Sequence, residues 1–201
     1  FIAQKKTTKY CVLAPNPSSF DAESRRLSDN DYRFLPFVKN SYVSDYYKQY
    51  DEKQAKLLWL SKWFPMLGVS YFNAEIFYPS VLSLVNPKKR NRFDDKGNYT
   101  YPTKLTEERD IRVFKEVNIR FSNGYVEKIK ALCDTNNITL ICYLSPVQAK
   151  KYITQLSKYI IVNHSNLLNN TAYFYDEIHV NFKGQKKSSV NFAESFRNIM
   201  H

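Results

Sequence analysis

The sequence predicts an α/β fold, a doubly wound parallel sheet flanked by helices. Two short runs, residues 10–14 and 138–144, are almost entirely apolar, as are strands that are buried on both faces of a sheet. Amphipathic stretches with helical spacing lie between and after these runs. Apolar strands that alternate with helices are typical of a parallel sheet covered on both faces.

The first strand is expected at residues 10–14, and the segment 15–19, which holds two prolines, ends it. Residues 20–50 are polar and aromatic and predict no element. Residues 51–64 carry apolar side chains at helical spacing, and Pro65 ends that helix.

A second helix is expected from about residue 73 to 85. Residues 86–104 combine charges, prolines and turn formers, which is typical of a surface loop or lid. We therefore expect a single domain, 1–201, with a helical and loop insertion at about 40–104.

The second half has the clearer pattern. Residues 106–132 place apolar side chains three or four apart, which predicts the longest helix of the chain. A buried strand follows at 138–144, and then an amphipathic helix at 148–159. A short strand is expected at 173–175, and a helix from about 185 to 200 ends the sequence.

The chain is basic, with 30 Lys and Arg against 19 Asp and Glu and a formal net charge of +11. Most of the excess is spread along the sequence, but Lys88, Lys89, Arg90 and Arg92 form one dense cluster. Such a cluster is a candidate contact for an anionic polymer or nucleic acid. Apolar residues make up 43%, which excludes a disordered tail. No run approaches the roughly 18 apolar residues of a membrane span, so no transmembrane segment is expected in this chain.

The three cysteines, Cys11, Cys133 and Cys142, lie in or beside apolar stretches, which favours buried small side chains. Cys133 and Cys142 could also meet in an oxidising compartment. The three histidines offer no spacing for a zinc site, and the four glycines are too far apart for a phosphate-binding loop. We therefore expect no metal and no cofactor.

The most informative motif follows the last expected strand. Asp176 and His179 are three residues apart on a turn before a helix. In such a turn the carboxylate can bind one ring nitrogen, fix the tautomer and stabilise the imidazolium. The other ring nitrogen can then take a proton from a hydroxyl nucleophile. The plainer interpretation is that the aspartate caps the next helix and the histidine is exposed.

Residues 173–196, YFYDEIHVNFKGQKKSSVNFAESF, resemble the last conserved block of the SGNH (GDSL-like) hydrolase superfamily. Residues 125–152 resemble the helix, strand and Ser-Pro turn of SGNH-like proteins that modify bacterial surface polymers. The resemblance covers roughly residues 105–200. It implies an SGNH or flavodoxin-like sheet, with Asp176 as the orienting acid and His179 as the general base of a serine nucleophile. It also implies an extracytoplasmic location at the cell envelope.

The nucleophile of that family is not found, because the sequence contains no Gly-Asp-Ser. One explanation is that the nucleophile lies on a strand upstream of Phe1, so that the chain lacks the first strand of its sheet. The other is a degenerate relative, with Ser18 or Ser19 after the first strand. Ser145 follows the central strand, and all three serines also fit ordinary loop chemistry.

The resemblance, together with the Asp-His motif, implies an ester hydrolase or O-acyl transferase, for example an O-acetyl transferase. Its substrate would be a carbohydrate or cell-surface polymer, and its site would be of the Ser-His-Asp type. The alternative is a non-catalytic basic module that binds an anionic polymer or nucleic acid on a degenerate fold of the same kind. The presence or absence of a serine block upstream distinguishes the two.

Overall fold

The computed structural model describes residues 7–21, 34–35, 37–49, 61–64, 81, 84–85, 101–103, 108–155 and 158–200. The chain divides into two compact units. One consists of Phe1–Glu23 and Phe93–His201, and the other of Ser24–Arg92. The expected single domain with an insertion at about 40–104 stays a prediction.

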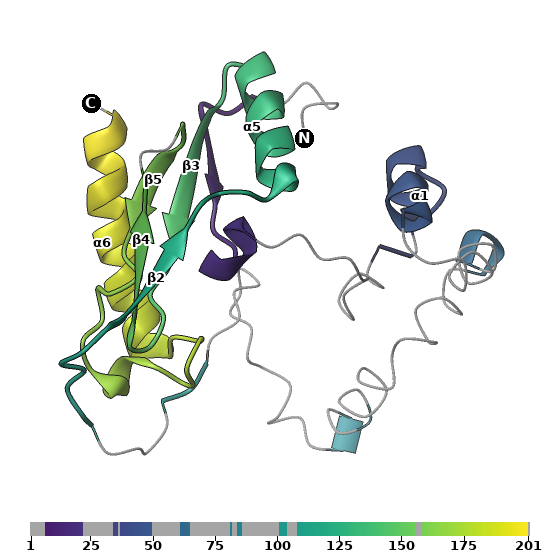
Figure 1. Ribbon diagram of the computed structural model, residues 1–201. Coiled ribbons are helices and arrows are strands. Elements are labelled where there is room, and N and C mark those ends of the chain that lie inside the picture. The colour runs from purple at the N-terminus through teal and green to yellow at the C-terminus, as the bar shows by residue number, and fades with distance from the viewer. Residues whose placement is uncertain are drawn as a thin grey trace. The chain divides into compact units, whose positions relative to one another are not determined.

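The first unit is an α/β structure with parallel sheets (Figure 1). Strand β3 (Thr139–Leu144) lies between β1 (Tyr10–Leu13) and β5 (Ile160–Asn163), and both pairings are parallel. Strand β2 (Lys115–Ile119) pairs in parallel with β4 (Lys150–Thr154). The two apolar runs of the sequence are thereby confirmed as strands.

Two helices flank the strands, α6 (Phe182–Met200) on one side and α5 (Gly124–Thr135) on the other (Figure 1). Helix α5 begins after Asn123, whose side chain accepts a hydrogen bond from the Tyr125 amide. The second unit contains α1 (Ser41–Lys48). Among the described residues, no helix has the length and apolar character that crossing a bilayer requires.

The core of the first unit lies around β3. Ile141, Cys142 and Leu144 are fully buried, and Phe20 and Ile119 pack into the same region. Because β3 is covered on both faces and bordered by strands on both edges, its sequence is apolar without alternation.

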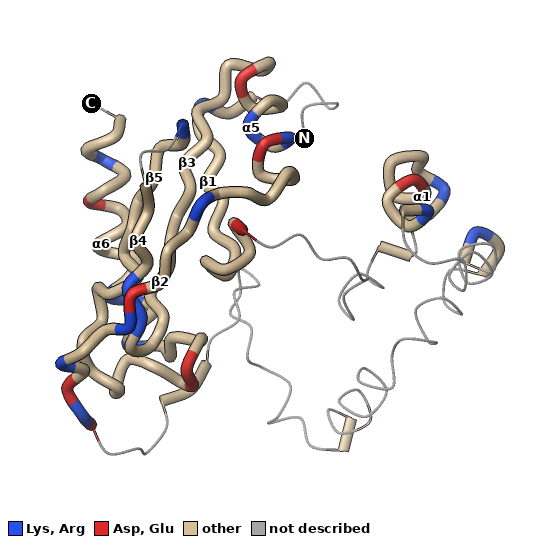
Figure 2. The backbone as a smooth tube through the Cα atoms, in the orientation of Figure 1, with Lys and Arg blue, Asp and Glu red and all other residues tan. Residues whose placement is uncertain are grey.

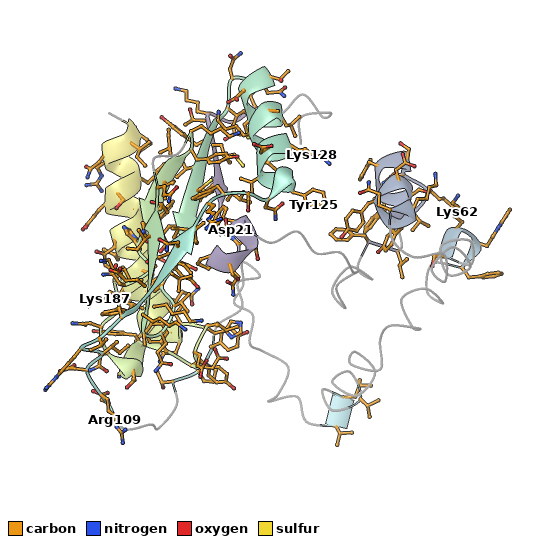
Figure 3. The ribbon with its side chains drawn as sticks, in the orientation of Figure 1. Asp21, Lys62, Arg109, Tyr125, Lys128 and Lys187 are labelled. Atoms are coloured by element: carbon orange, nitrogen blue, oxygen red, sulfur yellow. The ribbon has the colours of Figure 1, made fainter. Side chains whose placement is uncertain are left out.

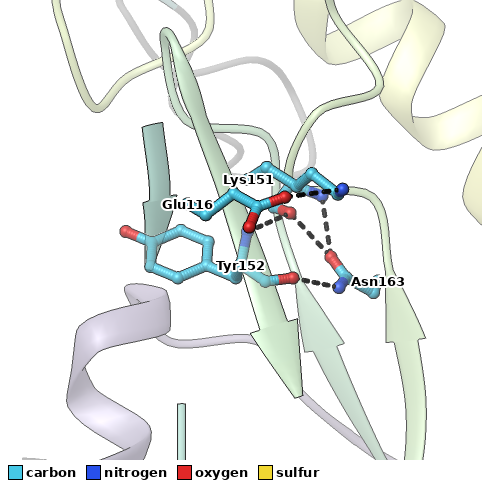
Figure 4. A network of polar contacts seen from close by, with 5 residues as sticks. Glu116, Lys151, Tyr152 and Asn163 are labelled. Atoms are coloured by element: carbon cyan, nitrogen blue, oxygen red, sulfur yellow. Dashed lines mark hydrogen bonds and ion pairs between the residues drawn. The ribbon is translucent and has the colours of Figure 1, made fainter. Parts of the chain in front are cut away.

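Side chains at and just after the end of β5 bind the middle of β4 (Figure 4). The Asn163 amide donates to the Tyr152 carbonyl oxygen at 2.6 Å, and the Ser165 hydroxyl accepts from the Tyr152 amide at 2.9 Å. Ser165 also donates to the side-chain oxygen of Asn163 at 2.7 Å. Nearby, Lys151 pairs with Glu116 across β4 and β2 at 3.0 Å. Basic and acidic residues alternate along the backbone of this unit without separating into two regions (Figure 2).

Residues 19–21, which precede the second unit, are hydrogen-bonded to residues 120–123, which precede α5. Asp21 is labelled in Figure 3. Asp21 follows a short 3-10 helix, Pro17–Phe20, and its Oδ1 atom accepts from the Arg120 amide at 2.8 Å. The Asn123 side chain donates to the Ser19 carbonyl oxygen at 2.8 Å. Residues about 100 positions apart are therefore held together.

The helix expected at 106–132 is wrong in its first half. Residues 115–119 form strand β2, in which Val117 and Ile119 are more buried than the other three residues. The positions of Phe114, Val117 and Phe121 match a helical period, but Phe121 has φ = 56°, which interrupts any continuous helix. The helix begins only at Gly124.

The helix expected at 148–159 is also wrong, because β4 occupies residues 150–154 and β5 begins at Ile160. The strand expected at 173–175 is replaced by a 3-10 turn, Thr171–Tyr173, and an isolated antiparallel bridge between Phe174 and Val180. In both segments the few apolar residues fit the spacing of a helix as well as that of a strand. The segment with which each one pairs therefore determines its secondary structure. The last helix is confirmed, and it starts three residues earlier than expected.

Several expectations fall mostly outside the described residues. Of the helices expected at 51–64 and 73–85, only residues 61–64, 81, 84 and 85 are described, and all of these except Phe64 are helical. Of the loop expected at 86–104, only residues 101–103 are described.

Candidate active site

Asp176 and His179 are in direct contact. The His179 Nδ1 atom lies 2.8 Å from Oδ2 and 3.0 Å from Oδ1 of Asp176. An ionised carboxylate only accepts hydrogen bonds, so Nδ1 carries the proton and donates it. This assignment leaves Nε2, on the other edge of the ring, as an acceptor for a reactant. Both side chains are partly exposed, 41% for His179 and 38% for Asp176.

The turn itself holds the Asp176 carboxylate. Its Oδ1 atom accepts from the amides of Ile178 at 2.9 Å and His179 at 2.8 Å, and the Tyr175 amide donates to the His179 carbonyl oxygen at 2.8 Å. Burial raises the pKa of Asp176. Hydrogen bonds from the His179 ring and from the two amides outweigh it and lower the pKa below its usual value. The carboxylate is therefore ionised and oriented at neutral pH.

Asn181 fastens this turn to helix α6. It is 1% exposed, and its side-chain amide donates to the carbonyl oxygens of Ala172 and Phe174 at 2.7 and 3.2 Å. Its oxygen accepts from the amides of Lys183 and Gly184 in the first turn of the helix. One buried side chain thus sets the position of residues 176–180, called the Asp-His loop below.

Gly184 lets the helix approach the chain that precedes the Asp-His loop. A Cβ atom at this position would lie 2.2 Å from the Tyr173 carbonyl oxygen and 3.1 Å from the Val180 Cβ. No side chain larger than hydrogen fits without a shift of backbone. Helix α6 makes a second contact with Tyr173, because the Lys187 ammonium lies 4.8 Å from the centroid of the Tyr173 ring.

Tyr101 covers one face of the His179 imidazole ring. Its ring stacks on the His179 ring, with centroids 4.6 Å apart and an angle of 28° between the planes. The Tyr101 carbonyl oxygen accepts from the Phe182 amide at 3.0 Å, which anchors this residue at the start of α6. The stacking restricts rotation of the imidazole, as does the bond to Asp176.

A pocket of about 500 Å³ adjoins His179. It lies where parallel α/β sheets commonly hold their sites, at the carboxyl ends of strands. Val12 and Ala14 at the end of β1, Tyr143 in β3, Ile178 in the Asp-His loop and Phe192 in α6 make much of its lining apolar. A volume of this size suits a small organic group.

The three serines considered from the sequence have different surroundings. Ser145 lines the pocket that His179 lines. Ser18 and Ser19 are not among the lining residues, and the Ser18 hydroxyl donates to the Asn16 side chain at 2.8 Å. Ser188 and Ser189 of α6 also line the pocket, but the Ser188 hydroxyl is closed off from solvent. No hydrogen bond joins any of these hydroxyls to His179 among the described residues.

Two expectations from the sequence remain, the absence of a metal site and the cluster of basic residues at 88–92. In the part of the chain that the structure describes, no group of three His, Cys, Asp or Glu side chains is arranged to hold a metal ion. The basic cluster of Lys88, Lys89, Arg90 and Arg92 lies outside the described residues.

Tyr101 and Asn181 belong to the site but were not singled out from the sequence. Asn181 had an available signal, since an asparagine directly before a helix is a common cap. Tyr101 had none, because it comes 78 positions before His179. Comparison with known protein families, with curated proteins and with solved structures finds no match to this chain.

Proposed function

We propose that this chain carries the acid and base of a Ser-His-Asp type site, in an ester hydrolase or O-acyl transferase. The observation that carries the proposal is the contact of Asp176 with Nδ1 of His179, beside a pocket that His179 lines. A buried or exposed structural histidine needs neither the contact nor the pocket. Perturbed and oriented titratable groups in a cleft are typical of catalytic sites.

In the proposed reaction, His179 Nε2 takes the proton of a serine hydroxyl as the oxygen attacks an acyl carbonyl. Asp176 stabilises the imidazolium that forms, without itself taking the proton. The imidazolium then gives the proton to the departing alcohol, and an acyl-enzyme remains. Water or a sugar hydroxyl, deprotonated by the same nitrogen, attacks this ester and releases the enzyme.

The nucleophile is proposed to lie on a strand upstream of residue 1, in a doubly wound sheet of the SGNH kind. The open side of β1 is consistent with such a strand. β1 pairs with β3 on one edge, and no described strand pairs with the other. Val12 in the middle of β1 is 42% exposed, although the strand is apolar throughout. Unpaired apolar edges are unusual in folded proteins and are normally covered.

The substrate class is the part of the proposal that rests on the resemblance alone. SGNH-like proteins that modify surface polymers suggest an acylated carbohydrate or cell-surface polymer. By the same resemblance, the protein would act at the cell envelope, outside the cytoplasm.

Hydrolysis of p-nitrophenyl acetate by the full-length native protein tests the proposal. We expect His179→Ala to remove most of the activity, while Glu177→Gln, an exposed neighbour in the same loop, retains it. Equal rates from the protein and its His179→Ala variant would exclude His179 as the base. Ser145→Ala separates the two sources of the nucleophile, since a loss equal to that of His179→Ala would place it in this chain.

The second candidate function is binding of an anionic polymer or nucleic acid, for which the net charge of +11 is the supporting observation. Binding through phosphates or sulfates releases counterions, so the affinity must fall steeply as salt rises. Titration of the protein with an acidic glycan and with an oligonucleotide at two salt concentrations measures this. Affinity that is indifferent to salt would contradict the electrostatic mechanism.

A further inference from the structure

The imidazole of His179 is contacted by different groups at its edge and on its flat face. Asp176 binds the edge that carries Nδ1, with Oδ2 at 2.8 Å. The Tyr101 ring lies against the flat face, with the ring centroids 4.6 Å apart and the planes inclined by 28°. Tyr101 and His179 also line the same pocket. Tyr101 therefore belongs to the immediate surroundings of the candidate base.

Tyr101 is held in place by contacts other than the one with His179. Its carbonyl oxygen accepts a hydrogen bond from the Phe182 amide at 3.0 Å, and its ring packs against the Tyr175 ring at 4.9 Å between centroids. The Tyr175 amide donates in turn to the His179 carbonyl oxygen at 2.8 Å. Because its backbone and a second ring fix Tyr101, its own ring can restrain the imidazole.

The face of an aromatic ring attracts cations. Its π electrons carry partial negative charge, so a cation within about 6 Å of the ring centroid is stabilised electrostatically. The His179 ring lies within that distance, and it becomes a cation when Nε2 takes a proton. The contact with Tyr101 is therefore stronger after the proton transfer than before it. An interaction that strengthens during the reaction lowers the barrier.

We propose that Tyr101 is a positioning residue of the candidate site, which fixes the His179 ring and stabilises the imidazolium through its π face. This inference rests on the proposed function, because that function requires a base that gains a proton during the reaction. Asp176 stabilises the same cation from the Nδ1 edge. A ring that only filled space beside His179 would need its size but not its charge distribution.

Two substitutions at position 101 test the need for the ring. In ester hydrolysis by the full-length native protein, Tyr101→Phe should keep kcat within about twofold, because the aromatic face remains. Tyr101→Leu should lower kcat by about 3–30-fold with little change in KM. Tyr175→Leu removes a ring that contacts Tyr101 and should cost less than Tyr101→Leu. Native kcat in Tyr101→Leu, or an equal loss in Tyr101→Phe, would overturn the proposal.

Fluorinated phenylalanines at position 101 separate the charge of the ring face from its size. Each fluorine withdraws electrons from the face, while the ring itself stays in place. We expect kcat to fall as fluorine atoms are added. We also expect diethyl pyrocarbonate, which modifies neutral imidazole, to label His179 faster across the series at pH 6, where an ordinary histidine is mostly protonated. Mass spectrometry of the digested chain measures this labelling.

The labelling rate requires no ester substrate, so it separates this inference from the proposed function. If the rate follows the fluorine content but ester hydrolysis does not depend on His179, the proposed function fails and the role of the Tyr101 face stands. If the rate is the same throughout the series, the inference is overturned, whatever the result with esters. Circular dichroism establishes that each variant is folded, and the Phe and Leu variants serve alone if the fluorinated chains do not fold.

Discussion

The His179 Nδ1 atom lies 2.8 Å from Oδ2 of Asp176, while the other oxygen of that carboxylate accepts two backbone amides of the same turn. The carboxylate is therefore held independently of the ring that it orients. An accidental surface contact between a histidine ring and a carboxylate would not require backbone amides that hold the carboxylate in place. Oδ1 also lies 3.0 Å from Nδ1, so the oxygen that the backbone holds contacts the ring as well, and this geometry is the basis for the predictions about the site.

Asp176→Asn is expected to lower ester hydrolysis by the full-length protein by about 10³–10⁴-fold. The amide keeps the size of the side chain but no longer stabilises an imidazolium, and its NH₂ group can favour the wrong tautomer. Initial rates with p-nitrophenyl acetate measure the effect. Glu177→Gln removes the adjacent carboxylate and should change the rate less than twofold, so a similar loss in both would argue for a general charge effect.

Gly184→Ala is expected to destabilise the first unit by about 1–3 kcal/mol. The added Cβ would meet the Tyr173 carbonyl oxygen at 2.2 Å, so either the helix or the preceding backbone must move. Urea denaturation gives the change. Lys183→Ala, one position earlier on the exposed side of the helix, is the matched control and should remain close to the native value. Native stability of Gly184→Ala would show that the close approach is not required.

Asn181→Ala is expected to cost about 2–4 kcal/mol of unfolding free energy, because it leaves the buried carbonyl oxygens of Ala172 and Phe174 without donors. Asn181→Asp keeps an oxygen that accepts from the first amides of α6 but loses the NH₂ group that donates to Ala172 and Phe174. It therefore separates the contribution of the accepted hydrogen bonds from that of the donated ones. Asn191→Ala, in the middle of α6, is the control. If Asn181→Ala is as stable as this control, the residue does not organise the Asp-His loop.

The surroundings of His164 predict that the free energy of unfolding falls in mild acid. Its Nε2 atom lies 3.0 Å from the Ser195 hydroxyl, its Nδ1 atom is buried without a partner, and burial lowers its pKa. Between its folded and unfolded pKa values, the unfolded chain binds the proton and the folded chain does not. The histidine's contribution is therefore fully present above the unfolded pKa, near 6.5, and is lost as the pH falls below it.

The measurement is the urea midpoint at several pH values between 8 and 5, for the native chain and for His164→Gln. One proton changes the unfolding constant by at most tenfold per pH unit, and this part of the slope should be absent from the variant. Parallel curves for the two proteins would contradict a half-buried, neutral His164.

The apolar strands were predictable because their sequence permits little else. Ile138 to Leu144 is apolar almost without a break, and only a position covered on both faces suits it. β2 was not predictable in the same way. Its apolar side chains are also spaced for a helix, and the information that decides is non-local, namely the pairing with β4 and the left-handed backbone of Phe121.

The same distinction holds for the site. The contact of Asp176 with His179 is local, since a turn of three residues brings the two side chains together, and the motif alone suggests it. The stacking of Tyr101 on His179 depends on where the chain returns after the second unit. A single sequence gives no measure of that return path.

The chain leaves the first unit after Asp21 and re-enters it before Tyr101, and both points are fastened by hydrogen bonds to the scaffold. With both ends anchored, the length of the segment between them changes the free energy of folding of the first unit little, because the cost of closing a loop rises by only about 0.6 kcal/mol per doubling of its length. We therefore expect the first unit to fold when the second unit is replaced by a segment of different length or sequence. Tyr101 belongs to the first unit and must be kept, because its ring supplies the aromatic face against which the His179 imidazole rests.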